Sequence, residues 1–136
     1  MTLFVHSRRV EFGDTDMAGI VHFSNYFRYM EAAETAFLRA RGLTVNWDDA
    51  GVHYGFPRVS AACDFTRPLM FEDSVDITVV LEKLGTKSVQ YRYEFRRDGA
   101  DIAVGRTAAV LCRSIRSGPF ESIPIPDDIR AKLESP

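Results

Sequence analysis

Two aspartates, Asp14 and Asp16, are the residues of this chain whose type and spacing could do chemistry. They lie in the segment EFGDTDMAGIVHFSNY, residues 11–26, between a strand-like run and a helix-like run. A carboxylate at such a place can act as a nucleophile or as a general base on water. Aspartate before a helix is also a common capping or turn residue, so either one can equally be structural. The helix cap itself could be Ser24 or Asn25.

Other kinds of site fit this pattern poorly. DTDMAG begins like a calcium loop, and Gly19 fits its sixth position, but Ala18 stands where that loop needs an oxygen ligand and Asn25 where it needs a bidentate glutamate. Two carboxylates this close together in a loop do not flank a sugar as glycoside hydrolysis requires. The chain has no G-x-S-x-G motif, and its histidines and cysteines lack zinc-binding spacing. We therefore expect neither a metal site nor a bound cofactor.

The kind of site that remains is a carboxylate beside the start of a helix. From about Phe23 to Arg41, apolar residues recur at spacings of three and four, and Gly42 follows as a natural stop. We expect this stripe to be largely buried; its members are Tyr26, Phe27, Met30, Ala33, Phe37 and Leu38. The first N–H groups of a helix are free donors, and the helix dipole favours negative charge there. A carbonyl oxygen held by these groups, with a carboxylate near the carbonyl carbon, has the geometry of acyl transfer. Gly19 lets the backbone approach a substrate closely.

Strand-like runs flank this helix, one before it and four after it. They are residues 4–12, 59–66, 75–84, 89–97 and 102–115. In the run 89–97, Val89, Tyr91, Tyr93 and Phe95 alternate with polar residues, which predicts that these four side chains share one face of the strand. Residues 43–57 are predicted to be irregular, and the tail from Pro124 allows one short helix. Tight turns at Gly85-Thr86 and at residues 97–100 indicate antiparallel pairing. An antiparallel sheet covered on one face by a single long helix is an α+β fold, which we expect to form one domain, residues 1–136.

Composition limits the partners and the location. Lys and Arg number 17 against 19 Asp and Glu, whereas a general nucleic-acid binder shows a basic excess. No apolar run approaches the roughly 18 residues of a membrane span, and no signal peptide is visible. Cys63 and Cys112 are expected to be free, as in a cytoplasmic protein. One helix covers such a sheet only partly, so an exposed sheet edge predicts a homodimer or a larger symmetric oligomer, such as a homotetramer.

The block RVEFGDTDMAGIVHFSNY, followed by a long helix that contains Glu31, resembles the 4-hydroxybenzoyl-CoA thioesterase family of the hotdog fold. The resemblance extends over nearly the whole chain in the order and length of the elements. It implies a long central helix wrapped by an antiparallel five-stranded sheet. It also implies hydrolysis of an aromatic or short-chain acyl-CoA to a free acid and coenzyme A, without a metal or a redox cofactor.

The same resemblance implies roles for single residues around the block. Asp16 takes the position of the catalytic carboxylate, acting as nucleophile or general base. The backbone N–H of Phe23 takes that of the donor that polarises the thioester carbonyl. Asp14 matches a structural loop residue, and Glu31 matches either a buried anchoring acid or an interface or solvent-facing charge. His22 either contacts substrate or water, or packs and caps the helix.

Four later residues match substrate-binding positions of that family. Lys87 and Ser88 match a turn that faces the nucleotide phosphates of coenzyme A, although Lys87 can equally be an ordinary solvated residue. Phe56 and Val59 lie where a strand begins to line the acyl pocket, although Phe56 can equally be core packing. Two alternatives stay open, namely an acyl-thioester hydratase or dehydratase and a non-catalytic acyl-CoA-binding module on the same fold.

Overall fold

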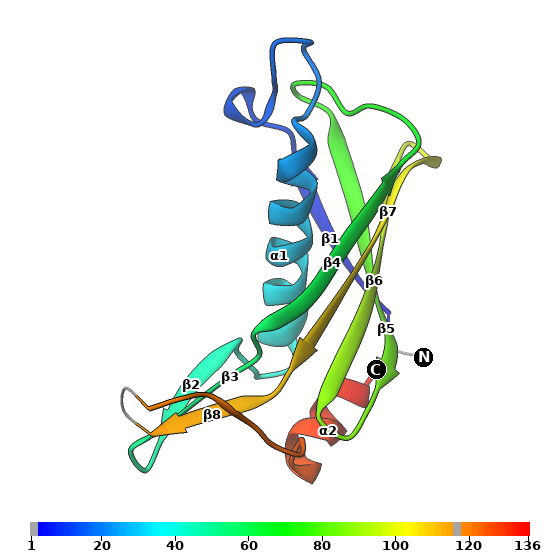
Figure 1. Cartoon of the computed structure of the whole chain (residues 1–136). Helices are drawn as coiled ribbons and strands as arrows, with labels where there is room; N and C mark the ends of the chain where they lie inside the picture. Colours follow the sequence, from blue (N-terminus) through cyan, green and yellow to red (C-terminus); the bar gives the residue numbers. More distant parts are fainter. Residues whose placement is uncertain (1–2, 116–117) are drawn as a thin grey trace.

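The computed structural model describes residues 3–115 and 118–136 of the chain (Figure 1). Its elements in chain order are β1 (Leu3–Arg9), the 3₁₀ turn η1 (Phe12–Asp14), α1 (Phe23–Ala40), β2 (Asn46–Asp49), β3 (Val52–Gly55), β4 (Arg58–Phe65), β5 (Ser74–Leu84), β6 (Ser88–Arg97), β7 (Ala100–Val110), β8 (Cys112–Ile115), β9 (Glu121–Ser122) and α2 (Asp127–Glu134). Within these residues no helix is long and apolar enough to cross a membrane.

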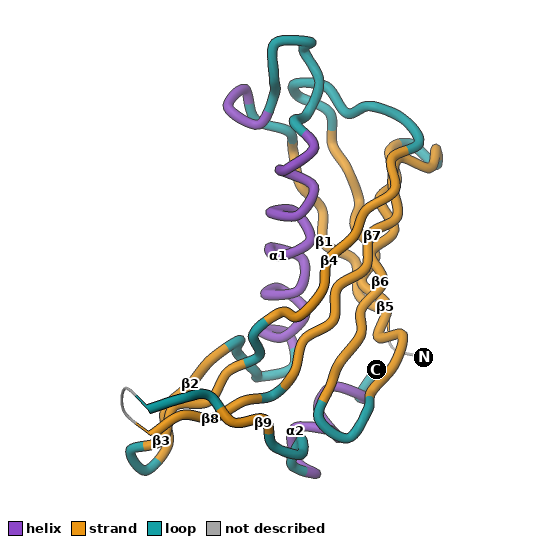
Figure 2. Tube along the Cα trace, viewed as in Figure 1, coloured by secondary structure: helices purple, strands orange, loops and turns teal. Residues whose placement is uncertain are grey.

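The main sheet has five strands in the order β1-β5-β6-β7-β4, and every neighbouring pair is antiparallel. Figures 1 and 2 show this sheet curving along α1. The predicted alternation in β6 is confirmed, because its inward residues are buried and its outward residues are not. The inward set is Val89, Tyr91, Tyr93 and Phe95. The expected α+β architecture, one long helix in a five-stranded antiparallel sheet, is therefore confirmed.

The sheet-facing side of α1 is apolar except for Glu34. The predicted stripe is buried except for Phe27, which is half-buried, and the helix also buries Tyr29 and Glu34, which the spacing argument missed. Strand β7 passes so close to the helix that a Cβ at Gly105 would collide with the sulfur of Met30. A side chain at position 105 would force Met30 to shift, so the close approach of β7 to the helix favours glycine there.

A second sheet of four short strands, β2-β3-β8-β9, was not predicted. The expectation that residues 43–57 are irregular is wrong, because β2 and β3 form a hairpin there whose turn has positive φ at Ala50 and Gly51. The expected long strand 102–115 is also divided. The N–H of Leu111 donates to the carbonyl oxygen of Lys87 (2.9 Å), after which β8 pairs with β3. Polar strands of four residues carry too little alternation to be recognised in sequence.

Strand β4 forms one edge of the main sheet. It pairs with β7 on one side, with an irregularity between Arg58 and Ser60, and no described strand pairs with its other side. Most of its residues are exposed, among them Val59 (64%) and Phe65 (49%). An exposed edge of this length is a place where another strand can add.

Candidate active site

The loop of residues 10–22 connects β1 to α1 and holds both aspartates. It begins where Val10 donates its N–H to the carbonyl oxygen of Asp73 (2.8 Å), which ends β1 earlier than the sequence suggested. Thr15 then pairs with Val21 in an isolated antiparallel bridge, so the chain reverses between them. Gly19 stands in this reversal with φ of +82°, a conformation that favours glycine.

Asp14 fastens this loop to the helix. Its carboxylate accepts hydrogen bonds from the N–H of Glu11 (2.9 Å) and from the buried hydroxyl of Tyr29 (2.7 Å). Its carbonyl oxygen accepts from the N–H of His22 (2.9 Å) and from Nδ2 of Asn25 (2.8 Å). These four bonds give Asp14 the geometry of a structural residue.

Asp16 is held differently. Its N–H donates to the carbonyl oxygen of Ile20 (2.8 Å), and its Oδ1 accepts from the N–H of Ala18 (2.8 Å) in a turn of the Asx type. Its Oδ2 has no hydrogen-bond partner among the residues that the structure describes. One carboxylate oxygen therefore orients the side chain, and the other is free for a reaction.

The first helical residue, Phe23, presents a free backbone donor. The N-cap is His22, rather than Ser24 or Asn25, and its Nδ1 lies 3.3 Å from the N–H nitrogen of Ser24 and accepts from it. The N–H of Asn25 donates to the carbonyl oxygen of His22 (2.9 Å). In the described part of the chain, the N–H of Phe23 has no such partner. It combines an unsatisfied donor with the positive end of the helix dipole.

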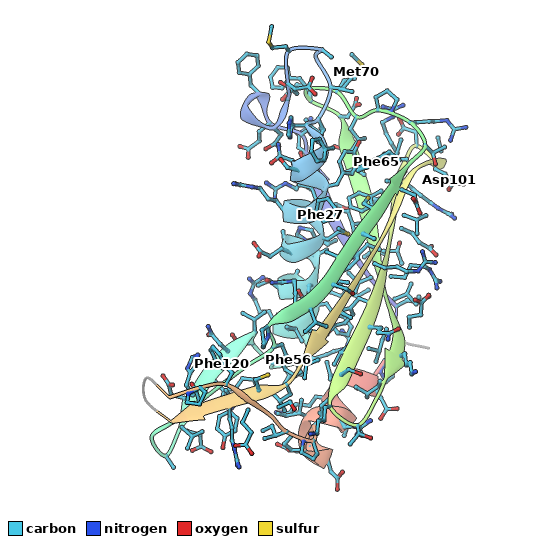
Figure 3. The ribbon with its side chains drawn as sticks, in the orientation of Figure 1. Phe27, Phe56, Phe65, Met70, Asp101 and Phe120 are labelled. Carbon is cyan, nitrogen blue, oxygen red and sulfur yellow. The ribbon has the colours of Figure 1, made fainter. Side chains whose placement is uncertain are left out.

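A cavity of about 480 Å³ brings these groups together. One wall consists of Asp16, the loop residues before the helix and the first turn of α1. The opposite wall is the end of β4 and the segment after it, residues 65–68. The two walls are tied where the N–H of Val21 donates to the carbonyl oxygen of Leu69 (2.8 Å), and Figure 3 shows Phe65 at this end of the molecule.

Three of the nine residues that line the cavity are aromatic, namely Phe23, Tyr26 and Phe65. The Tyr26 ring is buried and lies edge-on to the Phe65 ring, with centroids 4.9 Å apart. Burial raises the pKa of Tyr26, so this ring stays neutral. The Phe23 ring is exposed at the mouth. Sequence reasoning assigned Tyr26 to the core and missed residues 65–68 altogether, because they come from a strand end far along the chain.

The other predicted site residues do not line this cavity in the single chain. His22 caps the helix with its ring against Phe23, at a centroid distance of 4.7 Å. Phe56 packs on Trp47 at 6.1 Å and lies at the other end of the molecule (Figure 3). Lys87 donates from Nζ to Oγ of Ser122 (3.3 Å), and Ser88 begins β6 at that same end.

A cluster of three charged side chains, of which only Glu34 is buried, lies beside β4 and away from the cavity. The guanidinium of Arg58 contacts the carboxylate of Glu34, which is almost fully buried, and lies 3.6 Å from that of exposed Glu31. Burial raises the pKa of Glu34, and the attraction of Arg58 opposes this only in part. Of the two readings of Glu31, this geometry supports a charge on the exposed face of α1.

Comparisons with known proteins agree with this fold. Residues 10–133 match the family model described as the thioesterase-like superfamily. A putative esterase of Aquifex aeolicus is 35% identical over 122 residues, which cover 89% of this chain and 91% of that protein. The 1,4-dihydroxy-2-naphthoyl-CoA hydrolase of Nostoc punctiforme is 32% identical over 132 residues, which cover 97% and 87%.

A solved structure gives the same result in three dimensions. The structure of a gentisyl-coenzyme A thioesterase has a TM-score of 0.79 with this chain at 32% identity, covering 97% of this chain and all of the other, 100%. The resemblance noted in the sequence is thus confirmed at the level of fold and family. The chain belongs to the thioesterase-like superfamily.

Proposed function

We propose that this protein is an acyl-CoA thioesterase, which hydrolyses an acyl-CoA to a free carboxylic acid and coenzyme A. The observation that carries the proposal is the cavity at the start of α1, which is lined by both Asp16, with its free Oδ2, and Phe23, with its free N–H. The named relatives, a dihydroxynaphthoyl-CoA hydrolase and a gentisyl-CoA thioesterase, support this reaction class.

The geometry supports the following course of reaction. The thioester carbonyl oxygen accepts a hydrogen bond from the N–H of Phe23. This hydrogen bond becomes stronger as negative charge develops on the oxygen. Asp16 then either removes a proton from an attacking water or attacks the carbonyl carbon itself. In the first course water adds and the thiolate of coenzyme A leaves. In the second a mixed anhydride forms with loss of the thiolate, and water cleaves it.

The cavity walls favour an aromatic acyl group. The rings of Phe23, Tyr26 and Phe65 offer faces and edges on which a planar group can pack. Both named CoA-dependent relatives have aromatic acyl groups in their names. Short aliphatic acyl groups bury less of this surface, so we rank them second.

We also propose that the active unit is a homodimer formed along β4. An antiparallel two-fold pairing over Arg58–Phe65 places the start of β4 in one copy beside the end of β4 in the other. Val59, Phe56, Lys87 and Ser88 then approach the Asp16 cavity of the second copy, although they are distant from it within one chain. This pairing gives the substrate-binding residues expected from the sequence a shared location. A homotetramer of two such dimers stays a further possibility.

The location, the domain organisation and the state of the cysteines belong to the same proposal. We place this enzyme in the cytoplasm as a single domain, residues 1–136, whose two cysteines are free. Neither the reaction nor the cavity requires a cofactor.

Thiol release from a panel of aromatic and aliphatic acyl-CoAs tests the reaction. Asp16→Asn keeps the shape of the side chain and removes its charge, so kcat should fall by about a hundredfold or more. Asp128→Asn, on the exposed start of α2, is the matched control and should leave kcat unchanged. No release from any acyl-CoA, or equal rates in wild type and Asp16→Asn, would exclude this mechanism and favour a binding module or a hydratase.

Val59→Lys tests the dimer. Val59 is 64% exposed in the single chain, so lysine is compatible with the isolated fold, but it places a charge in the paired edge. Light scattering after gel filtration should change from a multiple of 15.4 kDa to 15.4 kDa, with activity lost. A wild-type protein that is already monomeric and active contradicts the dimer without affecting the role of Asp16.

A further inference from the structure

A second large hollow lies between α1 and β1. It has a volume of about 860 Å³ and is lined by residues of these two elements alone. We name it the α1–β1 groove and define it by His6, Arg8, Arg28, Glu31 and Arg39, with small residues between them on the helix. Because β1 and β4 lie at opposite edges of the sheet, this groove and the Asp16 cavity flank α1 on opposite sides.

The groove is basic, and two of its three arginines have no partner among the described residues. Arg28 and Arg39 are the only arginines in residues 3–115 and 118–136 that neither donate a hydrogen bond nor lie within ion-pair distance of a carboxylate. Elsewhere on the surface, arginines are paired, as Arg92 and Arg106 are with Glu82. The one carboxylate of the groove, Glu31, already faces Arg58 at 3.6 Å.

Arg8 adds a buried donor. Its guanidinium lies over the Tyr29 ring at 4.6 Å, and its nearest carboxylate oxygen, on Glu11, is 4.0 Å away. The Nε of Arg8 is buried and has no hydrogen-bond partner among the described residues. A bound acceptor can supply the hydrogen-bond partner that this donor lacks.

His6 reports the sign of the potential in the groove. Its pKa is lowered first by burial and then by the positive charges of Arg8 on the same strand and Arg39 on α1. Glu31 and Arg28 are the other charged groups that line the space. Burial is the largest cause of this lowering, and the remainder reflects the positive charges that Arg8 and Arg39 direct at the imidazole.

These observations select an anion as the occupant. A second copy of this helix face, packed antiparallel, would set Arg28 against Arg39 of the other copy, and like charges oppose that contact. Arg28 and Arg39 are eleven residues apart, a rise of about 16 Å along α1, and their long side chains can turn toward an anion held between them. Guanidinium groups bind phosphate with paired hydrogen bonds. We propose that the α1–β1 groove binds a small molecule carrying at least two phosphate groups.

Calorimetric titration with inorganic pyrophosphate at low salt tests the proposal. We expect saturable binding that Arg28→Gln and Arg39→Gln each weaken at least tenfold. Arg106→Gln, an exposed arginine on the outer face of the sheet, is the matched control and should bind as wild type does. Binding that is absent, or that the control weakens equally, overturns the proposal. Thermal melting shows that each variant is folded.

A second readout distinguishes an electrostatic site from a general loss of structure. A bound anion should raise the pKa of His6, which an NMR titration of its ring protons follows with and without pyrophosphate. The rise should disappear in Arg39→Gln. A His6 pKa that pyrophosphate leaves unchanged contradicts binding in this groove.

Two further arms identify the source of the phosphate. Coenzyme A that displaces pyrophosphate, and that binds more weakly to Arg28→Gln, would show that the phosphates belong to the proposed substrate. Pyrophosphate binding that coenzyme A does not affect would indicate a free phosphate compound. If pyrophosphate fails to bind and Arg39→Gln changes the oligomeric mass, the groove is an interface between copies and the proposal is wrong. None of these results depends on thioester hydrolysis, so the proposed reaction is tested separately.

Discussion

The hydroxyl of Tyr29 offers a sharp test of how the active site is positioned. Tyr29 is fully buried, and its O–H donates to the Asp14 carboxylate at 2.7 Å. Burial, together with the hydrogen bond and the charge of Asp14, raises the pKa of Tyr29 far above its usual range, so the hydroxyl stays a donor at every working pH. Through Asp14, this bond connects the middle of α1 to the loop that carries Asp16 and leads into Phe23.

Tyr29→Phe removes one hydrogen bond to a charged acceptor and leaves the ring in place. Such a bond contributes about 1.5–3 kcal/mol to the free energy of unfolding. In a chain of this size, that loss lowers Tm by roughly 3 °C per kcal/mol. Because the loop loses a fixed point, Asp16 and the N–H of Phe23 should shift relative to each other. Misplacement of about 1 Å can cost around a hundredfold in rate, so we expect kcat to fall at least tenfold with a smaller change in KM.

Tyr93→Phe is the matched control. Tyr93 is also fully buried, and its hydroxyl shares a hydrogen bond with Oγ1 of Thr107 (2.9 Å), away from the loop. This variant should lose about 0.5–1.5 kcal/mol and keep its kcat. Urea unfolding and thiol-release kinetics on both variants separate stability from positioning. If Tyr29→Phe lowers kcat no more than Tyr93→Phe does, the positioning argument is refuted.

Three other perturbations test single features. Gly19→Ala, at φ of +82°, should cost about 1–2 kcal/mol and lower activity, whereas Gly13→Ala, where φ is not positive, should cost less in the same melting assay. The raised pKa of Glu34 means that the neutral acid is the favoured form in the core, so its contribution to stability is complete below the ordinary value of 4.5 and is lost as pH rises through the folded pKa. Urea titrations should therefore show that the free energy of unfolding of the wild type falls above pH 4.5 relative to that of Glu34→Gln. In this variant Arg58 keeps its ion pair with Glu31. If the free energies of unfolding of the two proteins change in parallel with pH, the pKa of Glu34 is not raised. Burial raises the pKa of the Cys63 thiol to about 11. At pH 8, iodoacetamide should therefore modify Cys63 about a hundredfold more slowly than an ordinary thiol, and mass spectrometry can follow the reaction. Equal rates of modification would contradict the raised pKa.

Much of the main sheet could be predicted from the sequence because its strands are long and regularly patterned. The alternation of Val89, Tyr91, Tyr93 and Phe95 indicated a buried face, and helical spacing located α1 to within a residue at its C-terminal end. The second sheet could not be found in this way. Its strands are short and polar, and they exist only because β8 and β3 meet after the chain turns at Leu111.

One half of the candidate site was accessible from the sequence and the other was not. Asp16 and Phe23 lie within one local motif, and the structure places both on one cavity. The wall opposite them depends on where the end of β4 meets the loop before α1, which is a long-range contact without a local signal. The cap at His22 was also ambiguous, because the side chains of His22, Ser24 and Asn25 can each accept a hydrogen bond from an N–H group of the first turn.

The division of the cavity into two walls has a consequence for how selectivity can change. The groups proposed for chemistry belong to the loop and the first turn of α1, whereas Phe65 ends β4 and Pro68 belongs to the segment that follows it. Substitutions in that segment can reshape the space for the acyl group without moving Asp16 or the helix start. Proteins with this architecture can therefore diverge in the acyl-CoA they accept while retaining one reaction. A library confined to residues 65–68 is the corresponding design for changing the acyl preference of this enzyme.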